Sequence, residues 1–183
     1  YRHKYVLCYR LNAYCDSRRH LHISSPQKEV LQLIRFQKIR KVLNVKELIT
    51  FNDFQFIKSN DIHYLVNYIG EDTEITLPEN YNGNNYIISN YAFYDCSSLT
   101  SITIPESVTS IDDCAFSGCS GLTSITIPES VTSIGNFAFA GCISLKDLRI
   151  EDSNIPLELG ANGSSYYYTG EGMFSVCPLE TLY

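Results

Sequence analysis

The sequence predicts a mainly β protein, a solenoid of short stacked strands with 23-residue repeats, preceded by a capping β-hairpin and a short N-terminal helical segment. Residues 97–119 and 120–142 are nearly identical, and self-similarity at a fixed period is the signature of a repeat architecture. Within each copy, apolar residues alternate with Ser and Thr, the period of a half-buried strand. One such repeat cannot bury its apolar side chains alone, so the copies must stack.

Charge divides the chain near residue 50. Residues 1–50 hold 11 of the 14 Lys and Arg but three acids, a net charge near +8, whereas residues 51–183 hold three bases and 17 acids, near −14. We expect 1–50 to be a basic segment, partly helical or poorly ordered. A helix is predicted over 25–50, with Ser25 as N-cap and Pro26 in its first turn. Its apolar residues form a rough stripe: Val30, Ile34, Ile39, Val42, Leu43, Val45, Leu48 and Ile49.

Residues 51–69 are predicted to form the hairpin cap. The segments 54–57 and 62–68 read as its strands and 58–61 as the turn between them. We expect this hairpin to cover an otherwise exposed edge strand at the open end of the stack. The solenoid itself is assigned to residues 70–183. The chain begins at Tyr1 rather than Met and stops inside what looks like a further repeat, so we expect a fragment truncated at the C-terminus.

Each repeat carries the same apolar positions. Ile102 and Ile104 are expected on the inner side of a strand that Pro105 ends, because proline has no N–H for the ladder. The last inward positions of successive repeats form a predicted structural ladder: Phe93, Cys96, Phe116, Cys119, Phe139, Cys142, Phe174 and Cys177. The outer repeats carry insertions, in 81–86 and 153–172, that we expect to lie on loops.

The pattern Leu-x-x-Ile-x-Ile-Pro-x-x-Val-x-x-Ile-(x)3-Ala-Phe-x-x-Cys resembles the BspA-like (Treponema pallidum type) leucine-rich repeat family over about residues 70–183. Ser107 and Ser130 stand where better-known leucine-rich repeats use a ladder of Asn. The resemblance implies a repeat protein of host-associated bacteria or protists, located outside the cell or on its surface. It also implies an adhesin-like role in binding host matrix proteins, cell-surface proteins or other repeat proteins.

No catalytic group is predicted. The sequence has no nucleophile–base arrangement, no glycine-rich phosphate loop and no Cys-x-x-Cys, so we expect no cofactor and no metal. The ladder thiols are expected to be reduced, as small buried hydrophobes, although neighbouring coils are close enough for disulfides. Cys114 is expected to be partly covered and His63 to lie at the surface. No apolar run is long enough to span a membrane, and no signal peptide is visible.

Two binding surfaces are candidates. Outward strand positions should align in two rows: Glu74, Ser101, Ser124 and Asp147, then Thr76, Thr103, Thr126 and Arg149. The alternative is that Ser and Thr simply suit exposed strands. The second candidate is the insertion with Tyr166, Tyr167 and Tyr168, whose rings could instead pack on the solenoid flank. We predict a non-enzymatic protein-binding module, with no nucleic-acid partner because the repeats are acidic. The alternative is a passive spacer, or a repeat domain attached to an enzyme outside this fragment.

Overall fold

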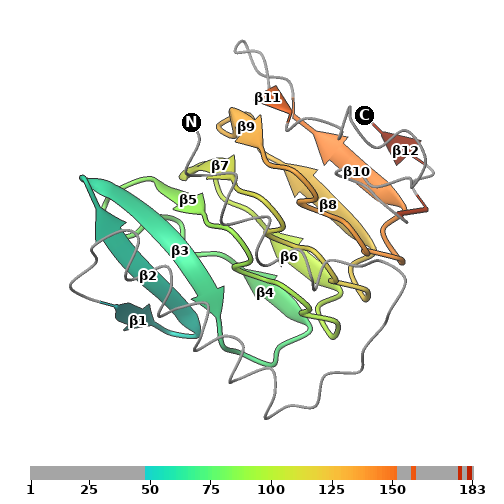
Figure 1. Ribbon diagram of the computed structural model, residues 1–183, viewed down its shortest axis with the longest axis horizontal. Helices are drawn as coiled ribbons and strands as arrows, with labels where there is room; N and C mark the ends of the chain where they lie inside the picture. The colour runs from blue at the N-terminus through green and yellow to red at the C-terminus, as the bar shows by residue number, and fades with distance from the viewer. Residues whose placement is uncertain (1–47, 152–157, 160–176, 179–180, 183) are drawn as a thin grey trace.

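The computed structural model describes residues 48–151, 158–159, 177–178 and 181–182, and within them the chain forms a solenoid with two strand-lined sides (Figure 1). The strands are β1 (Ile49–Phe51), β2 (Phe54–Ser59), β3 (Ile62–Tyr68), β4 (Glu74–Thr76), β5 (Tyr86–Ile88), β6 (Ser101–Thr103), β7 (Val108–Ile111), β8 (Ser124–Ile127), β9 (Ser133–Ile134), β10 (Asp147–Ile150), β11 (Glu158–Leu159) and β12 (Thr181–Leu182). One side is a seven-stranded sheet in the order β1-β2-β3-β5-β7-β9-β11. The other side holds β4-β6 and β8-β10-β12. The described residues contain no α-helix, and the mainly β prediction is confirmed.

The predicted hairpin is present as β2 and β3, which pair antiparallel around Asn60 and Asp61. Both turn residues have positive φ, 50° and 61°, a conformation that Asn and Asp tolerate well. β3 then pairs parallel with β5, so the hairpin covers the edge of the first coil as expected. β1 adds a third strand beside β2. The last two residues of the stretch predicted to be helical, Ile49 and Thr50, are therefore extended, and residues 25–47 lie outside the described part.

Each coil closes through a third side that contains no strand. Residues at equivalent corner positions have positive φ: Tyr91, Cys114 and Phe137 in one set, and Asp95, Gly118 and Gly141 in the other. The N–H of Phe116 donates to the carbonyl of Ala138 in the next coil at 2.8 Å, and that of Gly118 to Ala140 at 2.8 Å. Inter-coil hydrogen bonds thus run along all three sides, which is how the stack satisfies its backbone groups.

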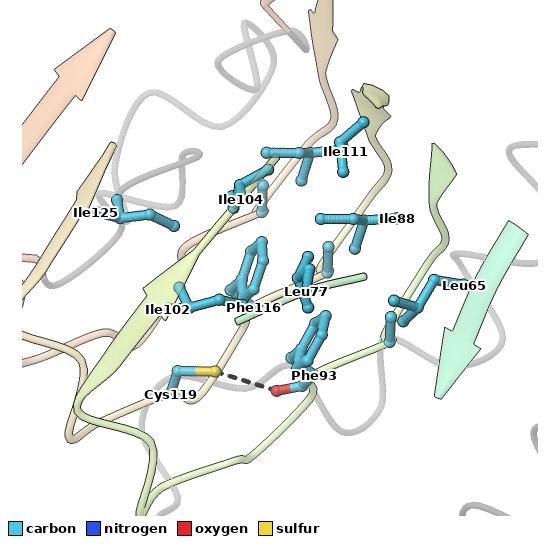
Figure 2. Close-up of a cluster of buried hydrophobic side chains, with 14 of the residues drawn as sticks. Leu65, Leu77, Ile88, Phe93, Ile102, Ile104, Ile111, Phe116, Cys119 and Ile125 are labelled. Carbon is cyan, nitrogen blue, oxygen red and sulfur yellow. Dashed lines mark hydrogen bonds between the residues drawn. The ribbon is translucent and has the colours of Figure 1, made fainter. Parts of the chain in front are cut away.

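The core is a continuous column of side chains that repeats from coil to coil (Figure 2). The rings of Phe93 and Phe116 stack with centroids 5.0 Å apart and an interplanar angle of 11°. Those of Phe116 and Phe139 follow at 5.4 Å and 2°. Ile102, between the exposed Ser101 and Thr103, points inward as its strand period requires. The predicted repeat phase is therefore confirmed where the structure describes it.

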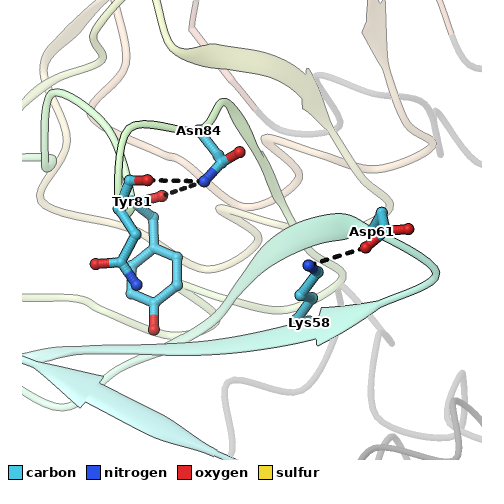
Figure 3. A network of polar contacts seen from close by, with 5 residues as sticks. Lys58, Asp61, Tyr81 and Asn84 are labelled. Carbon is cyan, nitrogen blue, oxygen red and sulfur yellow. Dashed lines mark hydrogen bonds and ion pairs between the residues drawn. The ribbon is translucent and has the colours of Figure 1, made fainter.

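The junction between the hairpin and the first coil is filled differently. Tyr81 stacks on Phe56 at 4.5 Å and 14°, and Tyr86 meets the same ring edge-on at 5.3 Å. The insertion 81–86 is thus not only an exposed loop, because Tyr81 anchors it in the core while Asn84 donates to the Tyr81 carbonyl at 3.3 Å (Figure 3). His63 was expected at the surface but is 7% exposed, because Tyr81 approaches its ring to 5.5 Å.

Candidate binding surface

The two predicted rows lie on the side of the solenoid formed by β4, β6, β8 and β10. Parallel pairing places Glu74 beside Ser101 and Thr76 beside Thr103. The next pair of strands aligns Ser124 with Asp147 and Thr126 with Arg149 in the same way. All eight residues are exposed, and each alternates with a buried aliphatic residue. The structure therefore assembles one polar strip across four coils, with hydroxyls at its centre and charged groups at its ends.

The central hydroxyls of this strip are available to a partner. Among the described residues, the side chains of Ser101, Thr103, Ser124 and Thr126 make no hydrogen bond within the protein. The hydroxyls one position earlier behave differently, a distinction that residue type alone did not reveal. Thr100 donates to the Thr73 carbonyl at 2.9 Å, and Thr123 donates to the Thr100 carbonyl at 3.3 Å. Those hydroxyls join the coils together at the start of each strand.

Several Ser and Thr side chains on the seven-stranded side have structural partners, although the buried hydroxyl of Ser107, just before β7, has none among the described residues. Ser110 and Ser133 bond each other at 2.8 Å across β7 and β9. Ser130 donates to the Val108 carbonyl at 2.8 Å, and Thr132 to that of Thr109 at 3.2 Å. The Ser130 hydroxyl thus bonds a backbone carbonyl, which is the role that the Asn ladder has in other leucine-rich repeats. The hydroxyls within β6 and β8 therefore stay open to solvent, whereas those just before these strands, and those named here on the seven-stranded side, link the coils.

The cysteine ladder is structural. No disulfide joins any described cysteine, and three of the ladder thiols donate to the carbonyl of the preceding coil's phenylalanine. Cys119 bonds Phe93 at 3.0 Å, and Cys142 bonds Phe116 at 3.2 Å. Burial raises the pKa of the Cys119 thiol, and the neighbouring Cys96 thiol adds to this, so Cys119 is a poor nucleophile at neutral pH.

Two details of the cysteine prediction differ from the structure. Cys114, expected to be partly covered, is fully buried at a positive-φ corner, where its backbone N–H donates to the Asn136 carbonyl of the next coil at 2.9 Å. The outermost ladder members, Cys96 and Cys177, are only half-buried. Cys177 still donates to the Phe139 carbonyl at 2.9 Å, so the ladder continues across the long insertion.

The second candidate surface, the insertion with Tyr166, Tyr167 and Tyr168, lies outside the described residues. Phe174, a predicted member of the ladder, lies outside them too. Within the described ranges, no group of three or more His, Cys, Asp or Glu side chains could hold a metal ion. The same part of the chain has no helix long and apolar enough to cross a bilayer. The strand-face strip is therefore the candidate site whose geometry is defined.

Residues 86–161 match the family described as "BspA type Leucine rich repeat region (6 copies)". This interval contains both near-identical repeats and strands β5 to β11. No curated protein matches the chain. The match is the one implied by the repeat pattern itself, and it confirms the resemblance.

Solved structures with a similar fold include a leucine-rich repeat protein from Bacteroides capillosus, at 22% identity and a TM-score of 0.43, over 58% of this chain and all of that one. The leucine-rich repeat protein of T. pallidum is 24% identical, with a TM-score of 0.47, over 62% of this chain and 64% of that one. A leucine rich cell surface protein from Faecalibacterium prausnitzii is 21% identical, with a TM-score of 0.35, over 75% of this chain and 54% of that one. The chain thus spans less than two thirds of the length of the last two.

Proposed function

Because residues 86–161 carry BspA-type leucine-rich repeats, we propose that the chain is a non-enzymatic protein-binding module of a larger, adhesin-like protein at the cell surface or outside the cell. The family resemblance supports the extracellular setting, as does the name of the F. prausnitzii protein, which is a cell surface protein. The partner is a protein: a host matrix or cell-surface protein, or another repeat protein.

The observation that carries this proposal is the open strip of hydroxyls on β6 and β8. Each hydroxyl can both donate and accept a hydrogen bond, and none of Ser101, Thr103, Ser124 and Thr126 uses this capacity inside the described protein. The strip is regular because parallel strands align equivalent positions, and solenoids present such extended surfaces to protein partners. The Tyr-rich insertion at 166–168 is a second proposed contact.

The test is binding of the full chain to a panel of extracellular matrix proteins, compared with a variant carrying Thr103→Glu and Thr126→Glu. Two carboxylates in the middle of a closed interface would be desolvated without partners. Affinity should fall at least tenfold, about 1.4 kcal/mol. The matched control is Ser97→Glu with Ser98→Glu, which adds the same charge at exposed turn positions outside both rows. Equal binding by the two variants would remove the strand face from the proposal.

The alternative is a passive spacer, or a repeat domain attached to an enzyme encoded elsewhere in a longer protein. Regular inter-coil bonding on all three sides favours this alternative, because it makes a rigid rod without needing any ligand. The same binding panel separates the two functions. A chain that binds no matrix protein, cell or repeat protein at micromolar concentration would favour the spacer.

A further inference from the structure

Neighbouring cysteines of the ladder are held together by a carbonyl that lies between them. The Phe139 carbonyl accepts the backbone N–H of Cys142 at 3.2 Å and the thiol of Cys177 at 2.9 Å. The sulfur of Cys177 and the backbone of Cys142 therefore share one acceptor. The strands that follow these cysteines, β10 and β12, pair in parallel, so the two coils are direct neighbours. Paired strands lie about 4.8 Å apart, which is within the Cα separation that a disulfide bridges.

The described ladder cysteines differ in access to solvent and in reactivity. Cys119 and Cys142 are fully buried, whereas Cys96 and Cys177, at the two ends of the ladder, are half-buried. A dissolved oxidant therefore reaches the ladder first at one of its ends. At Cys177, a hydrogen bond with the Cys142 thiol lowers the pKa below its usual range, and the Cys142 N–H acts in the same direction, while partial burial opposes both. Cys177 is thus both accessible and nucleophilic, because the thiolate is the form that attacks a disulfide.

We propose that Cys142 and Cys177 form a redox-sensitive latch, which a small disulfide such as glutathione disulfide closes into a covalent bond between two coils. The Cys177 thiolate attacks one sulfur of the small disulfide, forms a mixed disulfide and releases one thiolate. The Cys142 thiol then gives its proton to water, and its sulfur attacks that of Cys177 and expels the second thiolate. The two cysteines lose two electrons in total, and the small disulfide gains them and leaves as two thiols.

The first step of this reaction prepares the second. In the reduced pair, the hydrogen bond with Cys177 is the main cause that raises the pKa of Cys142, and burial and the charge of Cys177 add to it. A Cys177 sulfur bonded in a mixed disulfide carries no charge, so the charge and the hydrogen bond to a thiolate both disappear. Burial alone then opposes ionisation of Cys142, whose sulfur is within hydrogen-bond reach of the one that it attacks.

The closed latch fastens the coil that contains β12 to the rest of the stack. Cys142 and Cys177 are 35 positions apart, and the insertion 153–172 lies between them in the sequence. A covalent link across a loop of this length restricts the unfolded chain and thereby stabilises the folded one. Oxidation should therefore hold β12 on β10 more firmly, and reduction should release it.

Oxidation of the full chain by glutathione disulfide tests the latch, in a background where Cys8→Ser and Cys15→Ser remove the two cysteines outside the described residues. The remaining thiols are alkylated and the cysteine peptides are mapped by mass. A peptide pair linked through Cys142 and Cys177 should appear, while Cys119 stays a thiol that is alkylated only after denaturation. Mapping that finds Cys142 still a thiol, or bonded to Cys119 instead, would overturn the proposal.

Hydrogen–deuterium exchange measures the effect of the bond on the coil. Amides in peptides that cover 181–182 should exchange at least tenfold more slowly after oxidation and recover when dithiothreitol reduces the disulfide. Exchange across 101–134 should not change, because those coils lie outside the loop that the disulfide closes. If exchange at 181–182 is the same in both redox states, the disulfide does not act as a latch.

Three single variants separate the two chemical steps. Cys177→Ser should leave Cys142 unmodified, because the oxidant enters at Cys177. Cys142→Ala should trap the mixed disulfide on Cys177 and slow its formation at pH 7, because the hydrogen bond that favours the thiolate is lost. The matched control is Cys96→Ser, which removes the half-buried thiol at the other end and should leave the yield unchanged. Equal modification of Cys142 without Cys177, or loss of the disulfide in the Cys96→Ser protein, would refute Cys177 as the entry point.

Discussion

The repeated coils and the hairpin end of this protein solve the same packing problem in opposite ways. In the coils, each new turn adds one phenylalanine in the same orientation, with interplanar angles of 11° and 2°. At the hairpin, Tyr81 and Tyr86 meet Phe56 at 14° and 88°. Identical coils can propagate a column indefinitely, but ending it requires residues that do not repeat. The insertion 81–86, where the copies differ, is therefore used for packing.

The largest expected effect comes from removing one ring of the column. Phe116→Ala should lower the free energy of unfolding by about 3–5 kcal/mol, because Phe116 is fully buried between two stacked rings. Chemical denaturation measures this. If the column and the junction pack as differently as described, Tyr81→Ala should speed amide hydrogen exchange in residues 54–68 more than in the coils. If both variants speed exchange equally in residues 54–68 and in the coils, the junction and the column do not pack differently.

A smaller effect is expected where the coils approach most closely. A Cβ on Gly135 would lie 2.6 Å from the backbone carbon of Asp112, so Gly135→Ala must push two coils apart. We expect a cost of about 1–3 kcal/mol. At Gly83, in the insertion, an added Cβ would meet nothing within 4 Å. Gly83→Ala should therefore cost only the strain of placing Ala at a φ of 74°, about 1 kcal/mol. Thermal unfolding showing Gly83→Ala as the more harmful change would contradict the close approach.

Tyr86, which β5 pairs with Val108, makes the hairpin junction sensitive to alkaline pH. Burial raises the pKa of its phenol well above 10.0, while the hydroxyl donates to the Pro78 carbonyl at 2.7 Å. The folded state therefore keeps the Tyr86 proton in a pH range where the unfolded chain releases it, so the contribution of Tyr86 to stability is constant below about pH 10 and falls above it.

Tyr86→Phe should cost about 1 kcal/mol at pH 7, through the lost hydrogen bond. It should also flatten the alkaline decline in unfolding free energy. Denaturant titrations at pH 7 and pH 10.5 provide the comparison. A decline equally steep in both proteins would show that other groups with a raised pKa, such as the phenols of Tyr64 and Tyr68 and the Cys119 thiol, account for it.

The smallest effect is expected on the strand face. Ser101→Ala should change stability by no more than about 0.5 kcal/mol, because its exposed hydroxyl has no partner in the described protein. Thr100→Val, which removes the 2.9 Å bond to the Thr73 carbonyl, should cost more, about 1 kcal/mol. Equal costs in denaturation would contradict the division between open and structural hydroxyls on which the proposed binding surface rests.

Much of the fold could be predicted because it follows from local periodicity. Alternation in Ser-Ile-Thr-Ile decides which residues face inward, and the 23-residue period decides that they stack. The exposure of both polar rows follows from the same alternation. The strand at Ile49–Phe51 was missed because its apolar residues also suit a helical stripe, and only pairing with β2 selects the extended form. The burial of His63 was missed because Tyr81 reaches it from the insertion.

The sequence by itself determined the solenoid, its repeat phase and the polar character of its strand face, because each depends on spacing along the chain. The tertiary structure decided which hydroxyls are used. Thr100 and Ser101 are neighbours of similar chemistry, yet one bonds the preceding coil and the other stays open, because only the first reaches a carbonyl across the gap between coils. It also decided the role of Tyr81, since its ring gains a partner only when the hairpin folds back onto the first coil.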